Sequence, residues 1–379
     1  MALSKIDTTN MIEDVPQSKL DNNINFRNLI INGDMSIAQR ATSQATAGSA
    51  GGSYQTLDRF KLFQNTLGAF TWSQDTDVPT GQGFANSMKF DCTTADASPA
   101  AADYLLFRQD FEGQNVQYLK KGTSSAESLT LSFWVKSVKT GTYIAEIFDV
   151  DNDRSISKSY TIDSASTWEK KTLTFAGDTT GTLGNDNGGS LAVEFWLGGG
   201  TDYTSGTLAT SWGSRVSANR AVGQVNLADD TANNFWITGI QLEAGQTASE
   251  FEFLPYDVNL KRCQRYYYEL NLNQSSYPFG LYGYVFNTND FACGVTHPVP
   301  MRAAPSISTS GTTPVSRGGV NTGSNTSRTI SSFAFAQTPA PYNHTTFQAQ
   351  TGSGVLAAGT MAAVCNTSTN DTFAWSAEL

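Results

Sequence analysis

Histidine is almost absent from this sequence, and other residues of metal and nucleophile chemistry are scarce. The chain has 2 histidines, His297 and His344, and 4 cysteines that form no Cys-x-x-Cys pair. The sequence therefore offers almost no histidine from which to build a Ser-His-Asp triad or a histidine-based metal site. The P-loop, the Gly-x-Ser-x-Gly elbow and His-Glu-x-x-His are missing as well. We therefore expect no enzyme, although a pair of carboxylates that hydrolyses a glycan would need none of these residues.

Charge is the second deficit. Charged residues make up 15% of the chain, well below the roughly 25% that is typical of globular proteins, and the net charge is −10. Nucleic acid requires a basic patch, so we expect no nucleic-acid partner. A run of about 18 apolar residues is missing, and so is the apolar region of a signal peptide. We therefore expect that the protein does not insert into a membrane and that it is synthesised in a cytosol.

What the sequence does contain is glycine, aromatic residues and short alternating segments. Leu129–Val135 and Leu191–Leu197 each place four apolar residues on one face, which predicts half-buried strands. Eight weaker strands are predicted at Arg59–Phe63, Ala69–Ser73, Ser87–Asp91, Tyr104–Gln109, Tyr143–Val150, Ser157–Ile162, Lys170–Phe175 and Phe235–Leu242. Strands at this spacing, with Asn/Asp/Gly-rich turns between them, predict an all-β protein built on an antiparallel sandwich.

Composition divides the chain into four parts. Residues 1–27 are too polar to form their own core and would be disordered or order against a partner. Residues 28–255 hold the predicted sandwich. Residues 256–270 predict a helical connector, because Leu260, Cys263, Tyr267 and Leu270 follow helical spacing. Residues 271–379 are rich in Ser and Thr and hold only six charged residues, which predicts a second small β-rich domain that oligomerisation stabilises.

Four aromatic residues are candidates for carbohydrate binding, because aromatic rings stack on the apolar faces of sugars. Trp134 and Trp196 alternate with the apolar residues of their strands and so lie on the opposite, polar face. Tyr203 and Trp212 lie in a loop rich in Gly, Ser and Thr. The alternative for each is packing against a loop, a neighbouring domain or another subunit.

Asp149, Asp151 and Asp153 alternate as the carboxylates of a calcium loop do. The alternative is a polar hairpin turn, because the segment lacks the glycine and the distal glutamate of an EF-hand. No other cofactor is expected.

Three ordered sets of segments resemble the tail-fibre-type proteins of bacteriophages and prophages. They are Asn28–Arg40 with Tyr54–Phe60; Leu129–Lys136; and Phe235–Gly245 with Phe251, Glu252 and Arg262–Tyr267. The family's ending is also present, at Pro298–Pro305 and Ala377–Leu379. The resemblance implies a jelly-roll sandwich similar to carbohydrate-binding modules, followed by a tip domain. It also implies that Asn32–Asp34 lies near Gln241 and Glu243, a region that often holds a structural calcium in related modules.

From this resemblance we expect a structural protein of the virion, synthesised in the host bacterial cytoplasm. Residues 1–27 would anchor the chain to other virion proteins, and the sandwich or the tip of a homotrimer would attach to a host-surface glycan or protein receptor. One alternative is a virion connector or decoration protein with a purely structural jelly roll. A second alternative is a glycan depolymerase.

Overall fold

The computed structural model describes residues 26–46, 49–271, 281–310, 315–318, 328–330, 332–337, 342–351, 356–365 and 372–379. The chain divides into two compact units, Met1–Pro255 and Tyr256–Leu379. Residues 1–25 of the predicted arm lie outside the described residues. Within the described part, no helix is long and apolar enough to cross a membrane.

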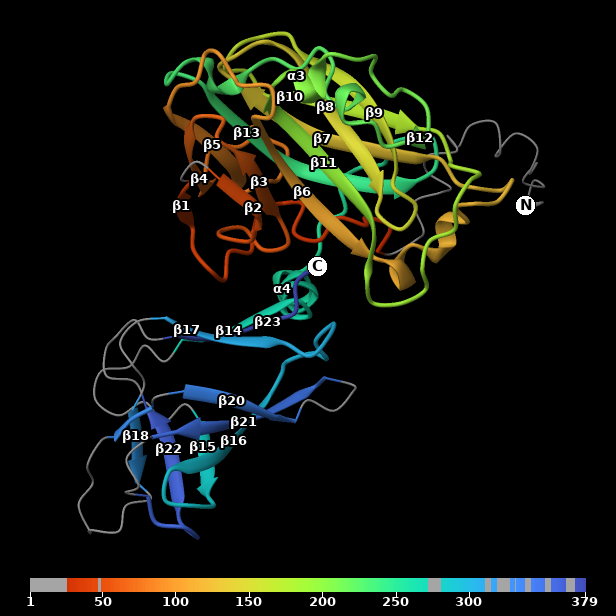
Figure 1. Ribbon diagram of the computed structural model, residues 1–379. Helices are drawn as coiled ribbons and strands as arrows, with labels where there is room; N and C mark the ends of the chain where they lie inside the picture. Colours follow the sequence, from red (N-terminus) through yellow and green to blue (C-terminus); the bar gives the residue numbers. More distant parts are fainter. Residues whose placement is uncertain are drawn as a thin grey trace, which may run out of the picture. The chain divides into compact units, whose positions relative to one another are not determined.

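Unit 1 is a jelly-roll sandwich of two antiparallel sheets that face each other (Figure 1). Across the first sheet the strands are β1 (Ser43–Ala45), β4 (Ala69–Asp75), β5 (Ser87–Thr94), β13 (Asn234–Ala244), β7 (Leu129–Ser137) and β10 (Glu169–Phe175). Across the second they are β12 (Gly213–Ser214), β9 (Arg154–Ile162), β8 (Gly141–Asp149), β11 (Gly189–Gly199), β6 (Tyr104–Glu112), β3 (Lys61–Asn65) and β2 (Ser49–Ser53). All ten strands predicted from the sequence are present.

Short helical turns lie in the connections of this sandwich. They are a helix α3 (Thr201–Thr204) and 3₁₀ turns at Gly113–Asn115, Gln117–Leu119, Ser217–Asn219 and Leu227–Asp229.

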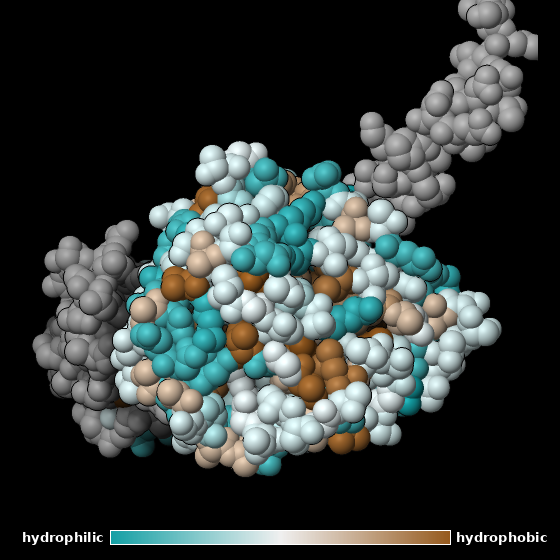
Figure 2. Space-filling model, turned by 90° about the horizontal axis from the view of Figure 1, so that it is seen from above, coloured by the Kyte–Doolittle hydropathy of each residue, from teal (hydrophilic) through white to brown (hydrophobic). Residues whose placement is uncertain are grey.

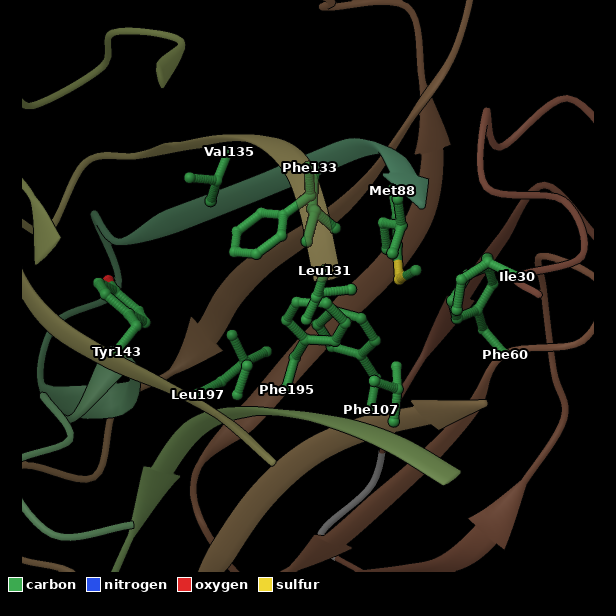
Figure 3. Packing of buried hydrophobic residues seen from close by; sticks show 14 of the residues in the cluster. Ile30, Phe60, Met88, Phe107, Leu131, Phe133, Val135, Tyr143, Phe195 and Leu197 are labelled. Carbon is green, nitrogen blue, oxygen red and sulfur yellow. The ribbon is translucent and has the colours of Figure 1, made fainter. Parts of the chain in front are cut away.

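The core of unit 1 lies between its sheets. The alternating apolar residues of β7 and β11 point inward and are buried, as the period-two pattern predicted. Aromatic rings fill much of the space: Phe107 stacks on Phe195 at 4.8 Å between ring centroids, and Phe133 meets Phe195 edge to face at 5.2 Å (Figure 3). The residues on the opposite phase of each strand therefore form the outer faces of the sandwich.

The beginning and the end of the sandwich are tied together. The amide of Leu29 donates to the carbonyl of Leu242 at 2.9 Å, and the amide of Ile240 donates to the carbonyl of Gly33 at 3.0 Å. The carboxylate of Glu243 accepts the amide of Ser249 at 2.8 Å. The expected proximity of residues 32–34 and strand β13 is thus present.

Unit 2 has a three-stranded and a seven-stranded sheet. The smaller sheet orders β14 (Tyr267–Asn271), β23 (Thr372–Ser376) and β17 (Ser306–Ser310). The larger orders β19 (Arg328–Thr329), β18 (Val315–Gly318), β22 (Met361–Cys365), β15 (Leu281–Val285), β16 (Asp290–Thr296), β21 (His344–Gln350) and β20 (Ser332–Gln337). A separate cluster of buried residues, among them Phe291, Phe373 and Trp375, forms its core.

The predicted helix over 256–270 is shorter than its apolar spacing indicated. Helix α4 (Tyr256–Gln264) ends before the tyrosine run, and Tyr267 and Leu270 belong to strand β14. Tyr267 pairs with Ser376 of β23, and the carbonyl of Tyr266 accepts the amide of Ala377 at 2.7 Å. Pairing with the last strand of the chain thus outweighs helical periodicity, since tyrosine favours strands.

One face of the larger sheet of unit 2 exposes large apolar side chains. Tyr282 and Tyr284 of β15 are 56% and 55% exposed, and Met361 of β22 is 61% exposed. Tyr284 lies directly opposite Met361 in the ladder. An apolar group of this kind on a sheet commonly marks a protein contact.

Candidate functional site

A groove lies on the side of the sandwich where β9 and β10, the last long strands of the two sheets, come together. It has a volume of about 540 Å³. Residues of both strands line it, together with the loop after β10 and the segment before β12. Binding pockets are commonly hollows of this kind, where elements of two layers meet.

Small polar side chains dominate the wall of the groove. Six hydroxyl residues line it: Ser128, Thr174, Thr179, Thr180, Thr210 and Ser211. Hydroxyl groups both donate and accept hydrogen bonds, so such a wall suits a ligand that is itself rich in hydroxyl groups.

Trp212 supplies the aromatic surface of the groove. Its indole Nε1–H donates to the carbonyl of Ala176 at 2.7 Å, and the ammonium of Lys121 lies 5.4 Å from its ring centroid. The following residues, Gly213 and Ser214, pair with β9. Trp212 is therefore a half-buried ring in a fixed orientation, which lowers the entropy cost of stacking on a ligand.

A charge network lies beside Trp212. The guanidinium of Arg154 donates to both carboxylate oxygens of Asp178 at 2.8 and 3.0 Å, and Lys121 lies 3.0 Å from Asp178 and also pairs with Asp149. Burial raises the pKa of Asp178, but hydrogen bonds from Arg154 and Lys121 outweigh burial and hold that pKa below its usual value. Asp178 is thus held as a carboxylate at neutral pH, and its ion pairs with Arg154 and Lys121 fix the loop after β10.

The four aromatic residues predicted from the sequence do not share one site. Trp196 has no exposed surface, and its Nε1–H donates to Glu146 at 3.2 Å. The guanidinium of Arg220 lies 4.6 Å from the ring centroid of Trp196. The ring of Tyr203, in α3, also covers Trp196, with 5.3 Å between the two ring centroids. The prediction of Trp196 as a sugar-stacking residue is therefore not supported, because the loop after β11 covers the ring.

Tyr203 lines a different hollow, of about 630 Å³, between α3 and the segment 216–218. Trp134 lies half-buried on the outer face of the first sheet, opposite Lys170 and Thr238 in the ladders. Only Trp212 of the predicted set therefore lies in the groove.

Sequence reasoning missed two further tryptophans on the outer face of the first sheet. The ammonium of Lys136 lies 4.3 Å from the ring centroid of Trp236 and 5.6 Å from that of Trp168. Trp168 donates to Asp77 at 3.0 Å. Trp236 alternates with the buried Phe235 and Ile237 in its predicted strand. This alternation could have identified Trp236 as a tryptophan on the outer face.

Two of the three aspartates of the expected calcium loop, Asp149 and Asp151, make other contacts. Asp149 is buried and binds the ammonium of Lys121, while Asp151 accepts the amide of Gly184 at 2.8 Å. Asp153 has a left-handed backbone with φ 48° in the turn between β8 and β9. A cation, Lys121, thus already neutralises Asp149, and the alternative of a polar hairpin turn describes this segment.

The second region expected to hold calcium, residues 32–34 with Gln241 and Glu243, also has other contacts. The carboxylate of Glu243 accepts hydrogen bonds from the hydroxyl of Ser249 at 2.7 Å and from the side-chain amide of Gln241 at 2.9 Å. The guanidinium Nε of Arg27 lies 3.6 Å from the same carboxylate. Across the part of the chain that the structure describes, no group of three or more His, Cys, Asp or Glu side chains could hold a metal ion. The carboxylate of Glu243 is therefore already occupied by hydrogen-bond donors and by a cation.

Glu146 and Glu194 form a pair of carboxylates on the outer side of the second sheet, but both are buried. Arg220 donates to Glu146 at 3.0 Å and also binds Glu194, and Arg215 and Arg108 donate to Glu194 at 3.1 Å. Burial and the charge of Glu194 raise the pKa of Glu146 to about 7. Because the loop after β11 covers this pair, it has no access to a glycan in this arrangement.

The face of the molecule drawn in Figure 2 is mainly polar. Figure 2 shows one face on which hydrophilic and intermediate residues dominate and apolar residues form small separate groups. A polar ligand suits this face better than a large apolar partner does.

No family model matches the sequence, and no curated protein matches it either. Among solved structures, it is similar to the enzymatically active domain of tailspike protein 4 of bacteriophage CBA120, with 15% identity, a TM-score of 0.30, and coverage of 57% of this chain and 21% of that one. A family 11 carbohydrate-binding module from Clostridium thermocellum, in complex with a mixed-linked tetrasaccharide, gives 14% identity, a TM-score of 0.26, and coverage of 57% and 94%. The N-terminal cellulose-binding domain of Cellulomonas fimi β-1,4-glucanase C gives 12% identity, a TM-score of 0.26, and coverage of 46% and 85%. At TM-scores this low the likeness carries no weight for function.

Proposed function

We propose that this chain is a non-enzymatic, tail-fibre-like subunit of a bacteriophage virion that attaches to a glycan on the host cell surface. The observation that carries glycan binding is the groove with Trp212 in a wall of hydroxyl side chains. Sugars present both hydroxyl groups and apolar C–H faces, and this wall offers a partner for each.

The assignment to a virion rests on the ordered segments that resemble tail-fibre-type proteins. The N-terminal arm would contact other virion proteins. Unit 2 would form a homotrimer through the exposed face of β15 and β22, where Tyr284 and Met361 lie opposite each other. A trimer presents three grooves, so weak single contacts would combine into useful avidity.

Glycan binding is tested by titrating the full chain with host-surface polysaccharide fragments in a calorimeter. Trp212→Ala should raise the Kd about tenfold or more, because the stacking surface is lost. Trp134→Ala is the matched control, since it removes a half-buried tryptophan from outside the groove, and it should leave the Kd unchanged.

Trp212 packs partly against the core, so a second variant separates binding from folding. Ser211→Trp fills the groove from an exposed position on its rim and should abolish binding with an unchanged melting temperature. Unaltered glycan binding in Ser211→Trp would refute the groove as the site.

A further inference from the structure

The groove contains one cation without a counter-ion, Lys158 of β9. Its side chain is half-buried and lines the groove. Among the residues that the structure describes, it has no hydrogen bond and no ion pair. The other charges at the site balance, because Arg154 and Lys121 pair with Asp178 and Asp149.

This lack of a partner is unusual in an acidic chain. Eight of the ten described lysines have a carboxylate within 4.0 Å, namely Lys61, Lys89, Lys120, Lys121, Lys136, Lys139, Lys171 and Lys261. The two exceptions are Lys158 and Lys170, and Lys170 is exposed to solvent. Lys158 is therefore the one half-buried ammonium group in the described part of the chain that lacks an acidic neighbour.

An unpaired ammonium group in a groove wall creates a positive local potential, which attracts an anion. The hydroxyl side chains and Trp212 provide the contacts that a sugar ring needs. Since the molecule as a whole carries a charge of −10, an acidic polymer would be repelled everywhere except where a local cation binds it.

We propose that the groove selects an anionic glycan, with Lys158 binding a carboxylate or a sulfate ester of the sugar that stacks on Trp212. This inference rests on the proposed glycan-binding function and adds the ligand's charge class. Arg154 is a positioning residue, since its guanidinium holds Asp178 and thereby the loop that borders the groove.

The experiment measures binding of three probes to the full chain: oligogalacturonate, its carboxyl-reduced neutral counterpart, and a sulfated galactan oligomer. The wild type should bind at least one anionic probe about tenfold more tightly than the neutral one. Which anionic probe binds distinguishes a carboxylate from a sulfate ester. The affinity for the anionic probe should fall when the salt concentration rises from about 50 to about 500 mM.

Three variants assign this preference to Lys158. Lys158→Gln should raise the Kd for the anionic probe about tenfold and leave the neutral probe unchanged. Lys158→Arg, which keeps the charge, should bind as the wild type does. Lys170→Gln makes the same change of charge at the other unpaired lysine, and it should have no effect.

The outcomes separate this inference from the proposed function. Equal binding of neutral and anionic probes that still depends on Trp212 would overturn the charge selection and leave glycan binding intact. A preference for the anion that persists in Lys158→Gln would overturn the role of this lysine. Failure of all three probes, with host glycans also unbound, would overturn both proposals.

Discussion

At the scale of single residues, the most demanding feature of unit 1 is the burial of Glu146 and Glu194 on the outer side of the second sheet. Burying two carboxylates away from water would be very costly if they had no cationic partner. The guanidinium groups of Arg108, Arg215 and Arg220 surround them. Burial opposes ionisation of Glu194, but the three arginines outweigh it and lower its pKa to about 2. Glu146 has the opposite shift, to about 7, because burial and the neighbouring charge dominate.

We predict that Glu146 makes unit 1 less stable as the pH rises. Its pKa in the folded protein, about 7, exceeds the ordinary value of 4.5, so between these values the folded state holds a proton that the unfolded chain has released. As the pH rises between these two values, the free energy of unfolding of the wild type should therefore fall relative to that of Glu146→Gln. The fall should be on the order of 1 kcal/mol per pH unit at most. Urea unfolding of both proteins at about pH 5 and about pH 8 measures this.

Glu127→Gln serves as the control for this experiment, because Glu127 has an exposed side chain and pairs with Lys120. The stability difference between it and the wild type should be the same at both pH values. Parallel pH profiles for Glu146→Gln and the wild type would contradict the raised pKa.

At the scale of elements, close packing between the first segment and the last long strand closes the sandwich. Strand β13 has a register shift between Thr238 and Gln241, and Gly239 within it has φ 62°. The carbonyl of Ile240 faces Gly33 so closely that a Cβ there would lie 2.2 Å from its oxygen. A glycine at position 33 therefore permits the backbone contact that joins the two ends of the unit.

We predict that Gly33→Ala weakens this closure and destabilises unit 1 by about 2 kcal/mol, since the strand must move to accept a methyl group. Gly51→Ala in the edge strand β2 is the matched control, because a Cβ at position 51 would have no other atom within 4 Å. Chemical unfolding should show a loss only for Gly33→Ala. Equal stability of the two variants would show that β13 can shift without cost.

At the scale of the whole molecule, the described residues of unit 2 gather exposed large apolar side chains on one face of a sheet, whereas the exposed large apolar side chains described in unit 1 lie outside its strands. The core of unit 1 spans both sheets and draws on strands from most of its length. Unit 2 has a separate core and leaves Tyr284 and Met361 exposed on its larger sheet. In the proposed trimer, further copies of the chain would cover this face and stabilise unit 2.

We predict that Tyr284→Glu converts the proposed trimer to a monomer, because a carboxylate on the contact face would lose its hydration. Light scattering after size-exclusion chromatography gives the mass directly. Ser308→Glu adds the same charge at an exposed position in the other sheet of unit 2, and it should remain a trimer. A monomeric wild type would exclude the trimer, and a trimeric Tyr284→Glu would place the contact elsewhere.

Much of the sandwich could be predicted because strand alternation is a local property. Leu191, Val193, Phe195 and Leu197 face the core as their spacing indicated, and Trp196 points to the other face. Neighbouring residues of a strand point to opposite sides whatever the rest of the chain does. The helix near residue 264 was predicted too long for the same reason, since local spacing does not reveal a pairing with β23.

The all-β class, the positions of the ten main strands and the phase of the aromatic residues within them follow from local residue patterns. Which outward residues remain accessible depends instead on tertiary contacts. The loop after β11 buries Trp196, Lys121 neutralises Asp149, and the meeting of β9 and β10 leaves Trp212 and Lys158 in one groove. Accessibility and charge pairing depend on segments far apart in the chain, so no local pattern encodes them.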